Sequence, residues 1–319
     1  MKLLAFLLTS AEHCIAYTGA GISTSSGIDD YASKGCKSKM KTSKYRPKTN
    51  TGLAALPSFA HYTLAALEKQ NQIQCWIQQN HDGLPQKANF PPNKMNEIHG
   101  AWFDPSNPVV PMNGSLRDDL YEWMLEEEQK ADLVLTMGTS LSGMNADRVV
   151  TTASEKFTTQ GIGLGSVIIG FQRTRLDDIC SLRIFSRIDE VMLLLAREMK
   201  LNMNLTPYQF KGNSNHVYNN LPYDSVTGKK KEKENTCQLN LQRGAKIKLT
   251  GGPGKGYIGH VVRTPNMNGG QKYAYTCQFP CTREHSKEQG KKPSYYSLGG
   301  WIIEAAMRGE ISELPVVNV

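Results

Sequence analysis

The sequence predicts an α/β protein in which an open, doubly wound parallel sheet precedes a small β-barrel-like domain. Three observations predict this fold class. Short apolar runs, typical of strands buried on both faces, alternate with helix-like patterns over the first 200 residues. The first run ends in a glycine-rich turn. The whole formal charge of +8 lies in residues 226–319, which hold 15 lysines and arginines and 7 acidic residues.

The composition is that of a folded protein. Of the 319 residues, 39% are hydrophobic and 21% are charged, which excludes global disorder. The longest apolar run near the start, Leu3–Leu8, is too short to span a membrane, and no small-residue cleavage site follows it. Seven scattered cysteines, an odd number, argue against a secreted disulfide framework. We expect an intracellular protein, cytoplasmic or nuclear, that binds no membrane.

The predicted sheet has five strands separated by helices. The strands are apolar runs at Cys14–Thr18, Ile73–Ile77, Leu133–Met137, Val167–Phe171 and Leu182–Phe185. The helices are predicted at Leu3–Ser10, Phe59–Gln70, Leu116–Lys130 and Glu190–Met199. Asp189 is expected to be the N-cap of the last helix. This alternation favours parallel strands joined by right-handed crossovers.

Two polar segments interrupt the alternation. Lys34–Lys48 carries seven basic residues and no acidic one, which indicates a loop. Residues 202–242 are rich in Asn and Tyr, and the run Lys229–Glu234 has no apolar face, which is typical of a solvated linker. We therefore predict a first domain at 1–200, a linker at 201–240 and a basic second domain at 241–319.

The glycine-rich turn is a candidate phosphate site. Gly19, Ala20 and Gly21 follow the first strand, and glycines at a strand-to-helix turn let backbone N–H groups approach a pyrophosphate. Taken alone, so short a pattern also fits a tight turn that needs small residues.

The longer string Gly19–Ile28 resembles the signature loop of the sirtuins, the NAD-dependent protein deacylases. Three further blocks match that family in the same order. Gln79–Leu84 is similar to its Gln-Asn-x-Asp-Gly-Leu motif, Glu97–Gly100 to its His-Gly motif and Gly138–Leu141 to its Gly-Thr-Ser-Leu loop. The resemblance covers roughly residues 3–200 and implies a Rossmann-like sheet with NAD as the cofactor.

The resemblance also implies roles for single residues. His99 is the expected general base, a role that suits an imidazole with a pKa near ~6.5. Asn80 is expected to position the ribose and the reacting water, while Asp82 and Ile28 hold the carboxamide. The full set of expected cofactor contacts is Gly19, Ala20, Gly21, Ile28, Asp30, Gln79, Asn80, Asp82, Gly138, Thr139 and Ser140. Alternate residues at a strand end share a face, so Asn80 and Asp82 can point to one side.

Several positions depart from the family pattern, and they cluster on the cofactor. Ala32 stands where the family has an arginine, Asp29 where it has a proline, and Gly170 where it has an asparagine. Pro85 and Gln78 replace a histidine and a threonine of the family. An added carboxylate beside a pyrophosphate is electrostatically unfavourable.

The cysteines that a sirtuin places after the His-Gly motif are missing. Residues 101–141 contain no cysteine, so no zinc module can form there, and we expect no metal. Val109–Gly114 stands in the place of the strand that binds the acyl peptide, and it lacks the family's Phe-Gly-Glu. The substrate cleft is therefore more altered than the nucleotide cleft.

The second domain reads as a set of β-strands. Arg243–Leu249 and Tyr257–Arg263 flank a glycine-rich turn and resemble a KOW motif of an SH3-like barrel. Tyr273–Cys277 is a third expected strand, and Trp301–Met307 a closing helix. Tyrosines interleaved with lysines suit stacking on RNA bases, and a protein-docking surface with a basic rim is the open alternative.

A metal site in this domain would need more ligands than the sequence offers. Cys277, Cys281 and His285 have a spacing loosely like that of zinc ligands, without a clear fourth, and buried thiols are the alternative.

Three functions remain open at this point. The first is an NAD-dependent deacylase of weakened activity that acts on acyl-lysine peptides. The second is a catalytically impaired subunit, retained for its fold, that docks into a larger assembly. The third is an NAD glycohydrolase, because nicotinamide cleavage needs Asn80 and His99 but no acyl-peptide cleft.

Overall fold

A six-stranded parallel sheet forms the centre of the first domain. The computed structural model describes residues 1–30, 52–111, 113–231, 236–280 and 294–319. The strands are β1 (Cys14–Thr18), β2 (Cys75–Gln78), β3 (Met95–Asn96), β4 (Leu133–Met137), β5 (Gly165–Ile169) and β6 (Leu182–Ile184). They lie in the order β3-β2-β1-β4-β5-β6, and all neighbours are parallel. The strand order therefore reverses between β1 and β4, at the switch point of a doubly wound sheet.

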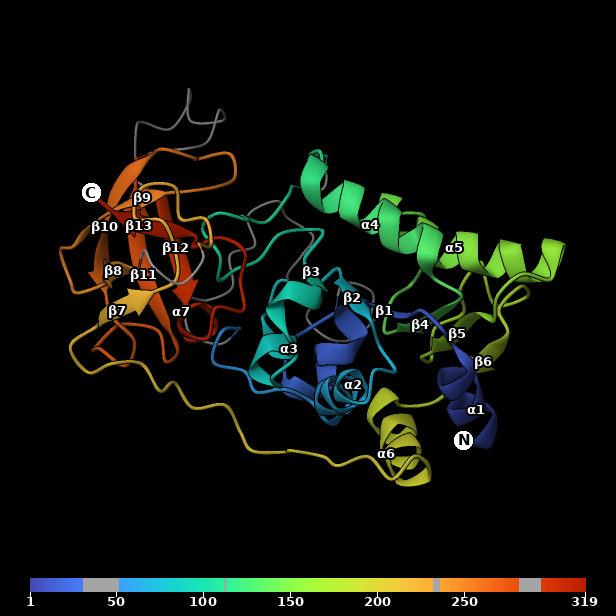
Figure 1. The fold of residues 1–319 in the computed structure, drawn as a ribbon. Helices are drawn as coiled ribbons and strands as arrows, with labels where there is room; N and C mark the ends of the chain where they lie inside the picture. The colour runs from blue at the N-terminus through green and yellow to red at the C-terminus, as the bar shows by residue number, and fades with distance from the viewer. Residues whose placement is uncertain (31–51, 112, 232–235, 281–293) are drawn as a thin grey trace.

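Helices cover both faces of this sheet (Figure 1). They are α1 (Lys2–Ser10), α2 (Phe59–Lys69), α3 (Leu84–Lys87), α4 (Asp118–Lys130), α5 (Arg148–Glu155) and α6 (Ile188–Glu198). Buried residues of α1, α2 and α6 share one core cluster with the sheet, and those of α4 and α5 share another. A 3-10 helix, η1 (Ala20–Ser26), follows β1 directly.

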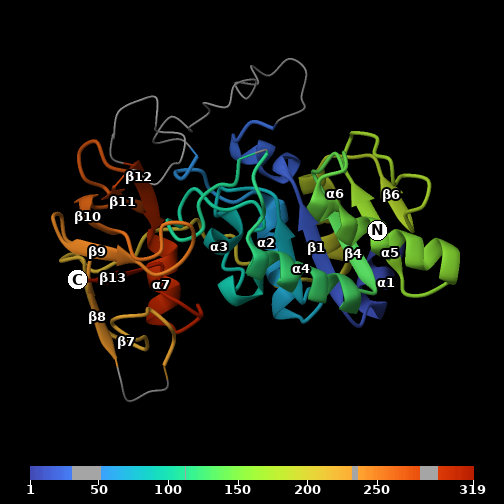
Figure 2. The same cartoon turned by 90° about the horizontal axis from the view of Figure 1, so that it is seen from above.

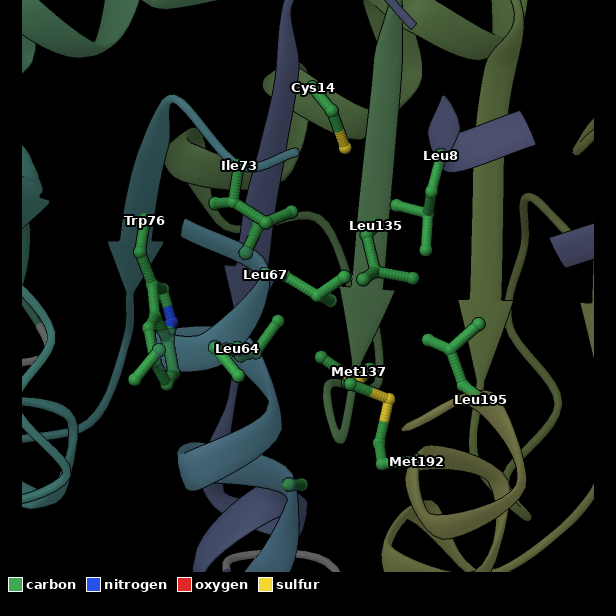
Figure 3. Packing of buried hydrophobic residues seen from close by; sticks show 14 of the residues in the cluster. Leu8, Cys14, Leu64, Leu67, Ile73, Trp76, Leu135, Met137, Met192 and Leu195 are labelled. Carbon is green, nitrogen blue, oxygen red and sulfur yellow. The ribbon is translucent and has the colours of Figure 1, made fainter. Parts of the chain in front are cut away.

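The alternation of the strands divides side chains between the two faces. Cys14 belongs to the cluster under α2 and α6, whereas Ile15 belongs to the cluster under α4 and α5. Figure 3 shows the first of these clusters, where Leu64 and Leu67 of α2 and Met192 and Leu195 of α6 point toward the sheet. Continuous burial explains why β1, β4 and β5 read as uninterrupted apolar runs.

The expected fold class of the first domain is confirmed, and two details differ. The sequence reading missed β3, α3 and α5, of which β3 and α3 are only 2 and 4 residues long. Asp189 is not the N-cap of α6, because Arg187 holds that position. Its carboxylate instead accepts a hydrogen bond from the Ala60 N–H at the start of α2, 2.8 Å away. The acidic side chain stabilises a neighbouring helix instead of its own.

The second domain contains two antiparallel sheets. The strands are β7 (Val217–Leu221), β8 (Cys237–Asn240), β9 (Lys246–Leu249), β10 (Ile258–Arg263), β11 (Ala274–Phe279), β12 (Ser294–Gly299) and β13 (Val316–Asn318). β7 pairs with β8, and the other five form a sheet in the order β12-β11-β10-β9-β13. Helix α7 (Gly300–Met307) follows β12. The expected strands and closing helix are therefore present, with β12 and β13 added.

The range 201–240, expected as a linker, contributes to the core of the second domain. β7 and β8 lie inside it, and Tyr218, Leu221 and Leu239 are buried in the second domain's cluster. The stretch that joins α6 to β7 has no regular secondary structure (Figure 1).

The two domains lie side by side in both views (Figures 1 and 2), and one hydrophobic cluster crosses between them. Leu53, Ala101 and Phe103 of the first domain belong to the same buried cluster as Tyr273 and Trp301 of the second. We call this contact the seam. In the described ranges, no helix is both long and apolar enough to cross a membrane.

Candidate active site

Two glycine loops touch where the strand order reverses. The Gly19 N–H donates to Met137 O (3.1 Å), and the Gly21 N–H donates to Gly138 O (2.8 Å). A Cβ atom at Gly21 would lie 2.7 Å from the Gly138 Cα, and Gly138 has a φ of +66°. Only glycine allows this approach. The crevice beyond such a switch point is the usual ligand site of an open α/β sheet.

The loop after β2 is tied to the first glycine loop through one hydroxyl. The Asn80 amide donates to Gly19 O (3.2 Å) and to Ser23 Oγ (3.0 Å), and Ser23 Oγ donates to Asp82 Oδ2 (2.7 Å). Asp82 Oδ1 in turn accepts the Leu84 N–H (3.0 Å). Asn80 and Asp82 lie in the loop beyond β2 and not on the strand itself, and Ser23, which was not predicted, joins the two side chains.

A second polar network fixes Gln79. Its amide donates to Tyr17 Oη (2.7 Å), and Tyr17 Oη donates to Asp147 Oδ1 (2.9 Å). Asp147 Oδ2 accepts the N–H groups of Gly143 and Met144. Burial and the Asp147 carboxylate raise the pKa of Tyr17, so the phenol stays protonated and can donate. The network therefore joins the ends of β1 and β2 to the loop after β4.

His99 lies beside Gln79. Its imidazole hydrogen-bonds the Gln79 backbone, and burial, aided by the neighbouring His81, lowers its pKa to about 4. His81 Nδ1 lies 2.7 Å from Gly100 O, which fixes the peptide that follows His99. At neutral pH the His99 ring is therefore uncharged and can accept a proton.

Comparison with known proteins decides the family. No family model matches the chain. An NAD-dependent protein deacetylase of Sulfurisphaera tokodaii is 30% identical over 234 residues, which are 58% of this chain and 90% of that protein. The deacetylase SRT1 of Arabidopsis thaliana is 28% identical over 64% of this chain and 50% of its own length. The chain belongs to the sirtuin family.

Other comparisons agree with this assignment. Mouse sirtuin-7 is 26% identical over 63% of the chain and 60% of its own length. The chain spans about half the length of the plant sirtuins that it matches. A solved Sir2–p53 peptide–NAD+ structure shares the fold, with a TM-score of 0.53 and 23% identity over 62% of this chain and 98% of its own. The expected sirtuin resemblance is confirmed, whereas the KOW-like resemblance of the second domain stays a prediction.

The other residues expected to contact the cofactor are Ala20, Ile28, Asp30, Thr139 and Ser140. Thr139 lies against Gly19, since a Cβ atom there would be 2.9 Å from the Thr139 Cβ, and Ala20 begins η1. The Ile28 N–H donates to Ser23 O, and half-buried Asp30 follows two residues later. Ser140 is not part of either network above, because its hydroxyl donates to Ser142 Oγ (3.2 Å).

The departures from the sirtuin pattern have structural consequences. Gly170 has a φ of +154° and open space around its Cβ position, so an asparagine there would strain the backbone. Asp29 is exposed, and Pro85 sits in the first turn of α3, where a missing N–H is tolerated. Ala32 lies outside the described residues.

Gln78 is the departure that the structure explains best. Its amide donates to Glu97 Oε1 (3.0 Å), and Gln86 donates to the same oxygen (2.9 Å). Burial raises the pKa of Glu97 to about 8 in spite of these two bonds. The carboxyl group two residues before His99 is therefore largely protonated at neutral pH.

The segment that stands in place of the acyl-peptide strand lies beside the candidate base. The Val110 N–H donates to His99 O at 3.0 Å, and Val109 is exposed. This segment is not a regular strand, and Met112 lies outside the described residues.

The described ranges contain no cluster of three side chains suited to a metal ion. Cys277 is buried and its thiol has a pKa raised to about 12, while Cys281 and His285 lie outside the described residues.

The sequence reading missed the residues that support the site. Tyr17, Ser23, His81 and Asp147 contact the expected residues and were not predicted. Ser23 and His81 stand inside quoted motifs, so their position was a usable signal. Asp147 lies beyond the Gly-Thr-Ser-Leu block, and no pattern marks it.

Proposed function

We propose that this sirtuin-family protein is an NAD-dependent protein lysine deacylase. The proposal is carried by the contacts among the loops after β1, β2 and β4, in which Asn80 and Asp82 bond to the first glycine loop and His99 lies beside Gln79. The names of the relatives support it, since the matched proteins of Sulfurisphaera, Arabidopsis and mouse are all described as NAD-dependent protein deacetylases.

The residues present fit NAD. Glycines at 19, 21 and 138 let the two loops pack on each other at the carboxyl end of the sheet, which is where an open α/β sheet binds a dinucleotide. The buried amide of Asn80 and carboxylate of Asp82 suit ribose hydroxyls and a carboxamide. These two side chains are already oriented by Ser23, so little ordering is needed when the dinucleotide binds.

In the proposed reaction the protein orients the reactants and moves a proton. Bound NAD supplies a ribose carbon whose nicotinamide can leave, and an acyl oxygen takes its place. Asp82 and Asn80 hold the ribose end, and their burial keeps bulk water away from it. His99 accepts a hydroxyl proton at the ring nitrogen that does not bond to Gln79.

We infer that NAD binds less tightly here than in sirtuins with the full motif set. Ala32 and Gly170 remove two side chains that the family uses, and Asp29 adds a carboxylate. Each lost buried hydrogen bond costs about 1–3 kcal/mol. The depressed pKa of His99 also makes the ring a weak base, which favours slow turnover.

One experiment separates the three candidate functions. Full-length protein is incubated with NAD and an acetyl-lysine peptide, and nicotinamide and free peptide are measured by mass spectrometry. Equal amounts of both products support the deacylase. Nicotinamide without deacetylated peptide supports a glycohydrolase. Neither product, with no NAD binding by calorimetry, supports a structural subunit and rejects the proposal.

We further propose that the second domain binds single-stranded RNA. Lys246, His260, Gln278 and Tyr295 are neighbours across β9, β10, β11 and β12 and so share the outer face of the sheet. Lys246 and His260 are exposed, and the Tyr295 ring is 50% exposed. An exposed aromatic ring on the same sheet face as a lysine suits base stacking and phosphate contacts. An acidic protein as the partner is the alternative outcome of the binding test.

A further inference from the structure

The loop that follows His99 is held by backbone contacts on both sides. The Ala101 N–H donates to Asn107 O (2.8 Å) and the Trp102 N–H donates to His81 O (2.9 Å). Gly100 has a φ of +82°, and a Cβ there would lie 2.3 Å from Pro108 O. The loop 99–107 is therefore a closed turn whose position decides where the imidazole points.

The far end of this loop is anchored in the second domain. Phe103 O accepts the Gly299 N–H (2.8 Å), and the Phe103 ring lies 5.1 Å from the Trp301 ring. Phe103 and Trp301 are 1% and 3% exposed. The anchor is thus a backbone bond and a buried aromatic pair, both supplied by the start of α7.

Trp301 also touches the loop that carries Asp82. A Cβ at Gly83 would lie 2.7 Å from Trp301 Cζ2 and 2.8 Å from Phe103 Cε1, so the indole packs directly on the Gly83 backbone. Gly83 has a φ of +69°, which a larger residue would not adopt easily. The indole therefore contacts the residue next to Asp82 and the ring at the end of the His99 loop.

A buried lysine joins a third segment to the same indole. Lys87 Nζ donates to Leu53 O (2.6 Å) and Ala55 O (2.9 Å) and lies 4.5 Å from the centre of the Trp301 ring. The side chain of Lys87 is fully buried. Burial lowers the pKa of Lys87 to about 7, so its charge is only partial at neutral pH. The two carbonyl bonds and the contact with the indole together fix α3 and residues 53–55 against Trp301.

We propose that Trp301 is a positioning residue for the candidate active site. The second domain contacts Gly83 through this indole and holds Phe103 through the indole and the Gly299 N–H, and thereby sets the placement of Asp82 and His99. The role goes beyond the stability of the second domain, because the ring contacts Gly83, Phe103 and Lys87 of the first domain as well as Tyr208 and Gly299 of the second. The inference deepens the proposed deacylase and rests on it.

The test uses two substitutions of Trp301 in the full-length protein, a control variant and a second variant of the same contact. Trp301→Leu removes the indole, and Trp301→Phe keeps an aromatic ring. Phe279→Leu is the matched control, because Phe279 is 1% exposed in the same core cluster but packs on Gly259 and Tyr296. Phe103→Leu cuts the same contact from the first domain, which provides a second variant where Trp301→Leu fails to fold.

We expect Trp301→Leu and Phe103→Leu to lower kcat about 10- to 100-fold, with KM for NAD changed less than about twofold. Trp301→Phe should restore most of kcat. Phe279→Leu should lower the melting temperature by a similar amount and keep kcat. Equal losses of kcat in Phe279→Leu and Trp301→Leu, or an unchanged kcat in both seam variants, would overturn the proposal.

Hydrogen exchange separates this proposal from the proposed reaction. In Trp301→Leu the amides of Ala101, Trp102 and Val110 should exchange at least tenfold faster, and in Phe279→Leu they should not. This comparison needs no turnover. If the wild-type protein does not deacylate, the proposed function fails while the exchange result still decides the role of Trp301. Unchanged exchange in Trp301→Leu would contradict it.

Discussion

The two domains differ in how their cores relate to the chain. In the first domain β1, β2, β3 and β4 are each followed by a helix before the next strand, and the functional motifs stand at the ends of these strands. In the second domain β13, from the last residues of the chain, pairs with β9, with Val316 opposite Leu249. The second core also takes Leu53, Ala101 and Phe103 from the first domain. The excess positive charge begins near residue 225, but the hydrophobic core of the second domain includes residues from well before that position.

The candidate site therefore lies on the side of the first domain that packs against the second domain. The glycine loops have contacts from β1, β4 and the loop after β2, all within the first domain, whereas the His99 loop has contacts from both domains. Substitutions in the two regions should therefore have separable effects on chemistry, stability and RNA binding.

The largest effect is expected from the candidate base. His99→Asn should lower kcat for peptide deacetylation about 10²- to 10⁴-fold, because a general base contributes that much. NAD affinity by calorimetry and RNA affinity should stay unchanged. His13→Asn is the control, since His13 lies at the amino end of β1 and bonds to Glu127. A His99→Asn variant with normal kcat would remove His99 from the mechanism.

Core substitutions should show whether the seam couples the domains. Leu135→Ala in the first core and Ile303→Ala in the second should each lower the free energy of unfolding by about 2–5 kcal/mol. Both residues are fully buried. Because the seam is a shared core, both variants should move one common transition in urea, followed by fluorescence and circular dichroism.

The control for this pair is Leu3→Ala, at a side chain that is 54% exposed, with an expected change below about 0.5 kcal/mol. Two transitions, each moved by only one of the core variants, would show that the domains unfold independently.

Acid should weaken the first domain through its buried histidines. Burial lowers the pKa of His61 to about 4, and its Nε2 has no hydrogen-bond partner. The unfolded chain binds this proton first, so stability is complete above pH ~6.5 and is lost as the pH falls toward about 4. For His61 the loss is on the order of 3 kcal/mol.

Urea unfolding at several pH values, with His61→Gln beside the wild type, checks this prediction. The variant should show a shallower slope between pH 6.5 and 4.5, whereas His260→Gln, at an exposed side chain, should not. Parallel curves for wild type and His61→Gln would contradict the role of His61.

Only substitutions in the second domain should change the affinity for RNA. Lys246→Glu together with Lys248→Glu should weaken binding of a single-stranded RNA about tenfold at low salt and reduce the salt dependence, since fewer counterions are released. Deacetylation should not change. An acidic peptide that competes with RNA and shows the same losses would favour the protein partner.

The sequence predicts a strand when the pattern that marks it lies within the strand itself. It does not predict a strand that forms only because a distant partner is available. β1 and β4 were predicted to the residue, because each is buried on both faces and reads as an unbroken apolar run. β3 has two residues and no pattern of its own; it forms because Trp76 and Ile77 of β2 offer a free edge. β13 likewise depends on a distant partner, β9.

The residues of the candidate site also fall into two groups: those that a local motif predicts and those that only the fold brings together. Gly19, Asn80, Asp82 and His99 stand in motifs. The structure joins the first three by hydrogen bonds and places His99 beside Gln79, and the roles of all four stay predictions. Asp147, which fixes Tyr17 and Gln79, is joined to them only by the fold. The seam was not predicted at all, because Phe103 and Trp301 are 198 positions apart in the sequence and their contact has no local pattern.

The smallest expected effect is that of metal removal. Chelation with EDTA or phenanthroline should leave the melting temperature of the first domain unchanged, because residues 101–141 contain no cysteine. Burial raises the pKa of Cys14 and Cys75, so these thiols stay protonated and are poor metal ligands. Calorimetry with and without chelator, together with elemental analysis for zinc, checks this prediction.

A metal effect, if found, can be assigned to one of the two domains. A structural zinc needs about four ligands, and Cys277, Cys281 and His285 are the residues of the second domain whose spacing resembles that of zinc ligands. If chelation lowers the melting temperature of the wild type but not of Cys281→Ser, the metal lies in the second domain. Stoichiometric zinc that persists in Cys281→Ser would place a metal in the first domain and contradict the prediction. Zinc loss from the second domain should also speed hydrogen exchange at the amides of Ala101 and Trp102, because their loop is anchored in that domain through Phe103.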